Sequence, residues 1–155
     1  MKIQLGDFND LQVQNLLRIH LLGMHETSPI ENSFALDLTG LQKPNIQFYT
    51  LWQDDVLLAC GAIQQLSPTH AELKSMRTHP EHLRKGAASQ ILQHLLEIAE
   101  QSQYQKVSLE TGTHVSFEPA ITLYKKFGFS KGESFSDYEG SEFNQFFHLN
   151  LVTHQ

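Results

Sequence analysis

Hydrophobic and polar residues alternate in several short runs of the chain, which is the pattern of β-strands that bury one face. The alternation predicts four strands in the first half of the chain, at residues 2–5, 46–52, 56–66 and 71–78. Asp54 and Asp55 separate the second and third of these runs and predict a hairpin turn. Lys106–Glu110 alternates in the same way, and weaker alternation over 143–152 predicts one or two closing strands.

Other segments repeat apolar residues with the spacing of an α-helix. This spacing runs from Val13 to Met24 and predicts a first helix, capped by Asp7 or Asp10 and stopped at residues 28–29, a Ser-Pro pair. The clearest helix follows residue 86, because the apolar residues then fall on one face over about 16 residues.

A third helix is predicted between Pro119, a favourable first-turn residue, and Gly128, a favourable stop. Residues 31–42 read as a loop with room for a short helix at 34–41. The order of elements is then β-α-(α)-β-β-β-α-β-α-β-β. This order predicts the α+β class, with one mixed central sheet flanked by helices.

The composition indicates a single domain spanning residues 1–155. The chain is 40% apolar and includes ten Phe, which is enough for one core. The formal net charge of −6 argues against a general nucleic-acid binder, since such proteins are usually basic. Cys60 is the only cysteine, which excludes an internal disulfide framework and favours a reducing compartment. No stretch resembles a secretory signal or a membrane span, so we expect a cytoplasmic protein without membrane partners.

The segment Met76–Ser89 joins a predicted strand to the longest predicted helix and carries the clearest candidate chemistry. Unpaired amides at a helix N-terminus bind phosphate groups, and the small residues Gly86, Ala87 and Ala88 would let an anion approach them closely. Between residues 74 and 85, four basic residues against one Glu give a local balance of +3. The segment is neither a Walker loop nor a GxGxxG motif. It is either an anion-binding loop or an ordinary solvated junction.

Two blocks of the sequence resemble motifs of the GNAT superfamily of N-acetyltransferases, which transfer an acetyl group from acetyl-CoA to an amine. Residues 83–88, LRKGAA, resemble the family's Arg/Gln-x-x-Gly-x-Gly/Ala motif, and residues 120–129, AITLYKKFGF, resemble its A-x-x-L-Y-x-x-x-G-F block. The element order is similar from Ile3 to Val152. The resemblance implies the GNAT fold, a twisted mixed sheet whose central strands splay near Met76, and acetyl-CoA as co-substrate.

The resemblance also implies a set of cofactor-binding residues: Met76, Arg77, Thr78, Leu83, Arg84, Lys85, Gly86, Ala87, Ala88, Ser89, Phe117 and Tyr124. Leu83 stands where the family usually has Arg or Gln, so one polar side chain is missing, although Arg84 and Lys85 retain the charge. Phe117 stands where many members have Asn and offers an apolar contact in place of a hydrogen bond. Ser89 is either a helix-start hydroxyl on a phosphate or a neutral surface residue.

The chemistry of amine acetylation identifies the catalytic candidates. An alkyl amine is protonated at pH 7 and must lose a proton before it attacks a thioester. Glu72 resembles the general-base glutamate of several family members; the alternative is a strand-surface Glu paired with Lys74. The resemblance places an oxyanion-binding N–H near Met76. Tyr124 is the candidate acid for the departing thiolate, because the motif tyrosine points at the cofactor sulfur; the alternative is core packing.

Other residues give weaker signals. His79-x-x-His82 is the closest pair among nine His, but it has no acidic third ligand at a familiar offset, so chance explains it better and no metal is expected. Cys60 lies in an apolar run and reads as a buried small hydrophobe rather than a nucleophile. Tyr138, together with His25 and Glu31, belongs either to an acceptor pocket or to the surface.

These observations predict transfer of the acetyl group of acetyl-CoA to a primary amine, small-molecule or amino-acid-like, by direct attack in a ternary complex. Glu26, Glu31 and Asp37 favour a cationic acceptor weakly. The alternative is a non-catalytic CoA-binding regulatory or interaction module of the same fold, and a structural partner without CoA affinity is a third reading. The oligomeric state stays open, with a homodimer as one option.

Overall fold

The computed structural model describes residues 1–24 and 38–151. Its helices and strands, in chain order, are β1 (Lys2–Leu5), α1 (Leu11–Met24), β2 (Ile46–Gln53), β3 (Val56–Ser67), β4 (His70–Thr78), α3 (Ala87–Gln101), β5 (Lys106–Gly112), α4 (Glu118–Lys126), β6 (Ser130–Gly132) and β7 (Asn144–Asn150). Two 3-10 turns, η1 (Pro80–His82) and η2 (Val115–Phe117), precede α3 and α4. Residues 38–41 are also helical. The strands and helices predicted within the described ranges are confirmed, whereas β6 lies outside the predicted closing region.

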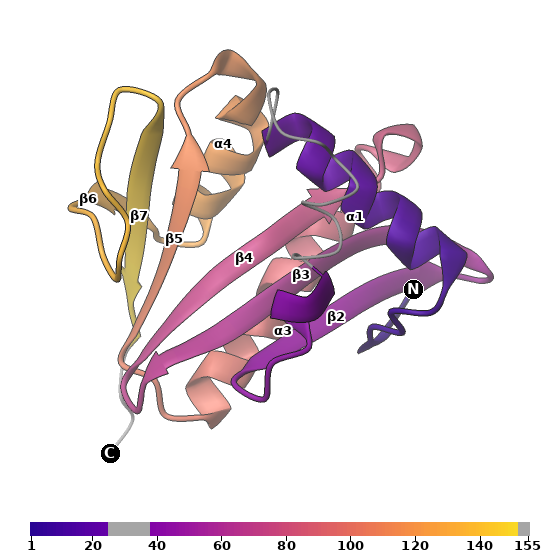
Figure 1. The fold of residues 1–155 in the computed structure, drawn as a ribbon, viewed down its shortest axis with the longest axis horizontal. Coiled ribbons are helices and arrows are strands. Elements are labelled where there is room, and N and C mark those ends of the chain that lie inside the picture. Colours follow the sequence, from indigo (N-terminus) through magenta and orange to yellow (C-terminus); the bar gives the residue numbers. More distant parts are fainter. Residues whose placement is uncertain (25–37, 152–155) are drawn as a thin grey trace. The chain divides into compact units, whose positions relative to one another are not determined.

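The strands form a mixed seven-stranded sheet in the order β1-β2-β3-β4-β5-β7-β6. Figure 1 shows β7 beside β5. The β4–β5 pairing is parallel, whereas β1–β2, β2–β3, β5–β7 and β6–β7 are antiparallel. The predicted α+β class with a mixed sheet flanked by helices is therefore confirmed. The chain divides into two compact units: unit 1 comprises residues 1–64 and 75–95, and unit 2 comprises residues 65–74 and those from 96 onward.

The core of unit 1 lies between α1 and the strands it packs on. The Asp10 side chain accepts hydrogen bonds from the backbone N–H groups of Gln12 and Val13 and so caps α1, as predicted. The apolar face of the helix then packs with residues of β2 and β3. The buried members of this core are Val13, Leu16, Leu17, Leu21, Leu41, Phe48, Leu57, Cys60 and Ala62.

The opposite face of β3 receives α3. Cys60 and Ala62 belong to the α1 core, so Gly61 between them faces the other way. A Cβ on Gly61 would lie 2.5 Å from Met76 Sδ and 2.7 Å from Ile91 Cγ2. Only a residue without a side chain allows this close packing.

In unit 2 the strand register separates β4, β5 and β7 into two faces. One face is apolar and consists of Ala71, Leu73, Val107, Leu109, Phe147 and Leu149. The other face, called here the titratable face, consists of His70, Glu72, Lys106, Ser108, Glu110, Phe146 and His148. Phe135 and Tyr138, from the segment between β6 and β7, contact rings of the titratable face.

Two predicted turn signals are confirmed by backbone conformation. Asp54 has a φ of 54° and Gln53 pairs with Val56, so Asp54 and Asp55 form the two-residue hairpin. Gly128 has a φ of 100° directly after α4, which is the left-handed conformation that glycine favours at a helix end.

Candidate active site

The candidate anion-binding loop lies in unit 1, between the end of β4 and the start of α3. His79 caps η1, because its Nδ1 accepts a hydrogen bond from the backbone N–H of Glu81 at 3.1 Å. Leu83 is then extended, and Arg84 and Gly86 follow with positive φ values of 65° and 77°. These two left-handed residues turn the chain into α3.

Gly86 is the residue directly before α3. Its carbonyl accepts the hydrogen bond of Gln90 N–H at 3.1 Å, so the amides of Ala87, Ala88 and Ser89 belong to the first turn. First-turn amides have no acceptor within their own helix and lie at the positive end of its dipole. A Cβ added to Gly86 would meet no heavy atom within 4 Å. The junction therefore has first-turn amides and no side chain at Gly86, the two backbone features predicted for an anion-binding loop.

The side chains of this loop differ in their exposure. Leu83, Arg84 and Lys85 are exposed, so both cations are available to a ligand in solution. Ala88 and Ser89 are half-buried, whereas the Ala87 side chain is only 2% exposed. The small side chain of Ala87 was predicted to let an anion approach, but its methyl group is buried in the core. Its amide alone remains a candidate contact.

The other cofactor candidates of unit 1 lie on β4. Ser75 has a φ of 56°, which distorts the strand directly before Met76. The paired residues of β4 and β5 end at Leu73 and Leu109, although β4 continues to Thr78. Met76, Arg77 and Thr78 are all half-buried. Arg77 Nε donates a hydrogen bond to His20 Nδ1 of α1 at 3.1 Å, so this side chain joins β4 to α1.

The structure also brings a third potential ligand to the His79–His82 pair. His79, Glu81 and His82 each offer one ligand atom, and these atoms lie within 4.8 Å of one another. The sequence analysis missed Glu81. However, His79 Nδ1 already accepts the Glu81 N–H, and His82 Nδ1 lies 3.1 Å from Lys85 Nζ. One nitrogen of each ring is thus engaged within the loop.

The catalytic candidate Glu72 lies on the titratable face of unit 2. It is only 3% exposed, and its Oε2 accepts a hydrogen bond from the Tyr138 hydroxyl. Burial raises the pKa of Glu72, opposed by the Tyr138 hydrogen bond and the charge of Lys74, while Glu110 raises it further. The surface position in the alternative interpretation of Glu72 is therefore wrong, whereas the charge of Lys74 does act on the carboxyl. A raised pKa makes a carboxylate a stronger proton acceptor, which is a property of a general base.

A chain of hydrogen bonds runs across the same face. His70 Nε2 lies 2.7 Å from Ser108 Oγ, which lies 2.6 Å from His148 Nδ1. His148 Nε2 donates to the carbonyl oxygen of Glu133 at 2.7 Å. Burial lowers the pKa of His70, and Lys106 and His148 lower it further. The sequence analysis did not find this chain, because its members lie 38 and 40 residues apart.

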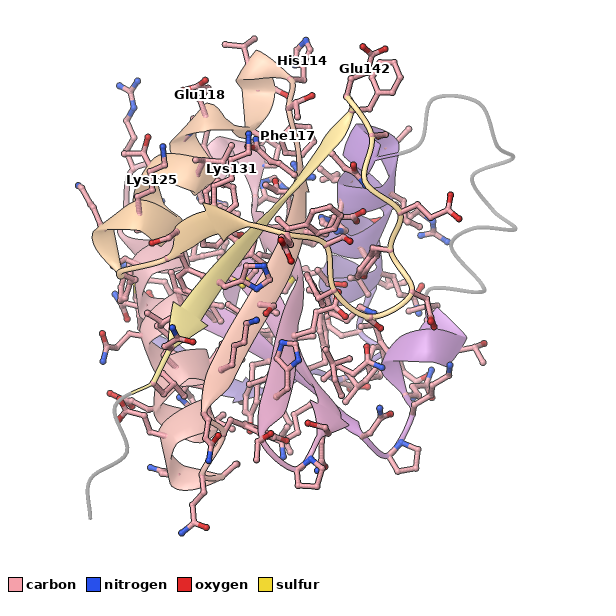
Figure 2. The ribbon with its side chains drawn as sticks, turned by 90° about the vertical axis from the view of Figure 1, so that its left-hand side faces the viewer. His114, Phe117, Glu118, Lys125, Lys131 and Glu142 are labelled. Atoms are coloured by element: carbon pink, nitrogen blue, oxygen red, sulfur yellow. The ribbon has the colours of Figure 1, made fainter. Side chains whose placement is uncertain are left out.

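Two candidates lie in α4 or directly before it. Tyr124 is 7% exposed, and its ring centroid lies 5.8 Å from that of Phe129, so the predicted burial is confirmed while its acid role stays a prediction. Phe117 lies at the junction between β5 and α4, next to His114 and Glu118 (Figure 2). Its ring covers Gly112, since a Cβ there would lie 2.4 Å from Phe117 Cε2. The phenyl ring therefore packs on the end of β5.

The remaining acceptor candidates, His25, Glu26, Glu31 and Asp37, lie outside the described residues. No helix within residues 1–24 and 38–151 is long and apolar enough to cross a membrane.

The comparisons with known proteins agree with the motifs. Residues 12–129 match the sequence profile of the acetyltransferase (GNAT) family. The chain belongs to this family. It is 48% identical over 138 residues to the uncharacterized N-acetyltransferase YsnE of Bacillus subtilis (strain 168), covering 89% of this chain and 91% of the relative. It is 41% identical over 149 residues to the uncharacterized N-acetyltransferase YedL of Escherichia coli (strain K12), covering 96% of this chain and 94% of the relative.

The GNAT fold is confirmed by solved structures. An acetyltransferase of Bacillus subtilis in complex with CoA has a TM-score of 0.72 and 18% identity, covering 97% of this chain and 99% of the other. The predictions of a GNAT member and of an N-acetyltransferase are both confirmed by the family match and the two named relatives.

Proposed function

We propose that this GNAT member transfers the acetyl group of acetyl-CoA to a primary amine by direct attack in a ternary complex. The observation that carries the proposal is Glu72, a buried carboxyl of raised pKa on a strand that leads toward an anion-binding loop. Amine acetylation needs such a base because the acceptor must lose its proton.

The cofactor is assigned to the junction of β4 and α3. The first-turn amides of Ala87, Ala88 and Ser89 are suited to the pyrophosphate, and the exposed Arg84 and Lys85 supply positive charge. A solved relative of the same fold holds CoA, which supports the same ligand class here. Met76, Arg77, Thr78, Leu83 and Phe117 are proposed as further contacts.

The proposed reaction keeps atoms and protons in balance. Glu72 takes a proton from the ammonium, directly or through a water, and the free amine nitrogen bonds to the thioester carbonyl carbon. The Met76 N–H stabilises the resulting oxyanion. The carbon–sulfur bond then breaks, and Tyr124 donates a proton to the departing thiolate. The nitrogen still carries one proton more than the amide product, and it gives that proton to the Tyr124 phenolate through solvent, while Glu72 releases its own proton to solvent. The products are an amide and CoA.

Direct attack is favoured over a covalent cysteine intermediate. Cys60, the only cysteine of the chain, is 1% exposed, and its Sγ donates to the carbonyl oxygen of Ser75 at 3.3 Å. A thiol held in this way is not accessible to an acyl donor.

The test is acetyl transfer from acetyl-CoA to a panel of primary amines, with mass spectrometry of the products. We expect acetylated amine only when enzyme, acetyl-CoA and amine are all present, and intersecting initial-rate patterns. Glu72→Gln should lower kcat/KM about 100-fold at pH 7 and recover partly at high pH. CoA binding without transfer to any amine would instead favour the non-catalytic module.

Tyr124→Phe tests the proposed acid separately. It keeps the buried ring and removes only the hydroxyl, so kcat should fall about 10- to 100-fold while acetyl-CoA affinity is kept. A donor with a more acidic thiol should show a smaller loss. Equal kcat values, with chemistry shown to be rate-limiting, would assign Tyr124 to packing.

A further inference from the structure

Tyr138 donates its hydrogen bond to one of the two carboxyl oxygens of Glu72. The hydroxyl donates to Oε2, and the two residues lie 66 positions apart. A carboxylate has two oxygens, so Oε1 is the atom left to receive a proton from a substrate. The contact therefore orients the carboxyl group and also supplies it with a hydrogen-bond donor.

The segment that carries Tyr138 is packed on the titratable face through Phe135. This ring is 8% exposed, and its centroid lies 5.2 Å from that of Tyr138 and 5.8 Å from that of Phe146. It also lies 5.8 Å from the His70 ring and 5.7 Å from the His148 ring. Phe135 is thus the apolar anchor of the segment.

Polar contacts hold the segment on both sides of Tyr138. Before it, the Glu133 carbonyl oxygen accepts a hydrogen bond from His148 Nε2. After it, Asn144 Nδ2 donates to the carbonyl oxygen of Glu139 at 3.0 Å and to Glu110 Oε2 at 2.9 Å. The position of the Tyr138 hydroxyl is therefore determined from both ends of its segment.

The Glu133 carbonyl ends the chain of hydrogen bonds that runs through His70, Ser108 and His148, and it fixes which atom donates at that end. A carbonyl oxygen only accepts, so His148 Nε2 carries a proton; when the ring is neutral, its Nδ1 is an acceptor. Ser108 must then donate to His148 and accept from His70 Nε2. Each polar atom of the buried Ser108 link has a matched partner in this arrangement.

We infer that Tyr138 is a positioning residue of the reaction, which stabilises the carboxylate form of Glu72 and directs its Oε1 to the acceptor amine. The inference rests on the proposed function, because it concerns the same base. Burial raises the pKa of Tyr138, and its contact with Glu72 raises it further, so the phenol stays protonated and remains a donor at neutral pH. Its hydrogen bond in turn lowers the pKa of Glu72 against the effect of burial.

Tyr138→Phe is the direct test, because it keeps the ring contacts with Phe135 and Phe146. Loss of the donor should raise the pKa of Glu72, so the acid limb of the kcat/KM profile should move to higher pH. On the acid side the loss should be roughly tenfold, since hydrogen bonds to charged groups are typically worth that factor or more. At high pH the loss should be smaller, and CoA affinity should stay unchanged.

A second readout does not depend on turnover. The Glu72 carboxyl carbon can be titrated by NMR in protein labelled with ¹³C-glutamate, with Glu72→Gln used for assignment. We expect its midpoint to move to higher pH in Tyr138→Phe. The matched control is Tyr104→Phe, a half-buried tyrosine outside the Glu72 hydrogen bond, which should leave the midpoint in place.

Ser108→Ala tests whether the hydrogen bonds of Ser108 with His70 and His148 help to hold the segment that carries Tyr138. It removes the link between His70 and His148, so hydrogen exchange of the amides of residues 133–143 should become faster. The Glu72 midpoint should then move in the same direction as in Tyr138→Phe, by a smaller amount. This variant also keeps the inference testable if Tyr138→Phe does not fold.

An unchanged Glu72 midpoint and an unchanged acid limb in Tyr138→Phe would overturn the inference. Failure of the proposed function is distinguishable from this outcome, because it would show as normal transfer in Glu72→Gln or as no transfer in the wild type. The NMR titration reports the Tyr138 contact in either case.

Discussion

Both β4 and β5 are followed by a histidine that caps a 3-10 turn, and each turn leads to a helix. His79 Nδ1 accepts from the N–H two residues later in η1, and His114 Nδ1 does the same in η2, both at 3.1 Å. The local cap is therefore shared. What differs is the chain between the turn and the helix.

After η2, α4 begins at once. Its first turn contains Glu118 and Pro119, so it carries a negative charge and lacks one amide hydrogen. After η1, four residues intervene, with Arg84 and Gly86 in left-handed conformations, before α3 begins. Two of these residues, Arg84 and Lys85, carry positive charge shortly before the first turn of α3. The two junctions thus share the turn and differ in how the chain leaves it, and the proposed anion-binding role rests on that difference.

The strongest way to break this comparison is Gly86→Asp. A negative side chain in a left-handed position beside the first-turn amides should lower CoA affinity at least 100-fold, since like-charge juxtaposition costs several kcal/mol. Gly128→Asp is the matched control, because Gly128 has a φ of 100° at the end of α4. It should lower the melting temperature and leave CoA affinity unchanged. Equal calorimetric affinities for Gly86→Asp and wild type would remove the phosphate role from this loop.

The charges of the loop give the next largest effect. Changing Arg84 and Lys85 together to Ala should weaken CoA binding about 10- to 100-fold at low salt, because charge-assisted contacts to phosphate are lost. The difference should shrink at 0.5 M salt. Lys125→Ala with Lys126→Ala removes the same charge from the last turn of α4 and should change the affinity less than about twofold. A loss that does not respond to salt would indicate a folding defect.

The two caps allow a finer test. His79→Ala and His114→Ala each remove the side-chain acceptor of a 3-10 turn, so each should lower the free energy of unfolding by about 1 kcal/mol. Only His79→Ala should also weaken CoA binding, by about threefold, because only η1 leads into the anion-binding loop. Denaturant titration and calorimetry measure the two effects. If both variants weakened CoA equally, the distinction between the junctions would fail.

The smallest expected effect concerns Glu72 on the titratable face of unit 2, and it should be absent at the two junctions. The pKa of Glu72 is raised in the folded protein, so folding favours its neutral form. This contribution is fully present below the unfolded pKa and is lost as the pH rises through the folded pKa. Glu72→Gln cannot ionise and should therefore melt above wild type at pH 7.5. The difference in melting temperature between Glu72→Gln and wild type should vanish near pH 4, whereas the difference between His114→Ala and wild type should persist. A Glu72→Gln difference that does not change with pH would exclude this linkage.

Local signals in the sequence predicted much of the fold. Asp10, Gly86 and Gly128 act at helix ends, where a single side chain or its absence determines the backbone conformation. The long amphipathic helix was equally clear. By contrast, β6 has three residues, all exposed, so no alternation marks it. Its pairing with β7 depends on a strand that comes later in the chain.

The candidate site was only partly predictable for the same reason. Gly86 and its basic neighbours form a contiguous motif, whereas the Glu72–Tyr138 contact and the Ser108 links join residues dozens of positions apart. Such contacts depend on strand register and on the path of a connecting segment, which a single sequence does not encode as a local pattern. Glu81 was missed because the 3-10 turn that gathers it with two histidines was not predicted.

The burial of Cys60 gives the molecule a built-in reporter of its own opening. A thiol reagent can label only molecules in which β3 of unit 1 has transiently opened, since Cys60 is the single cysteine and is 1% exposed. The labelling rate under native conditions therefore measures the free energy of that opening. A ligand that binds only the closed form slows labelling by the factor 1 + [L]/Kd. Labelling protection by CoA would thus give its affinity without any acceptor amine being known.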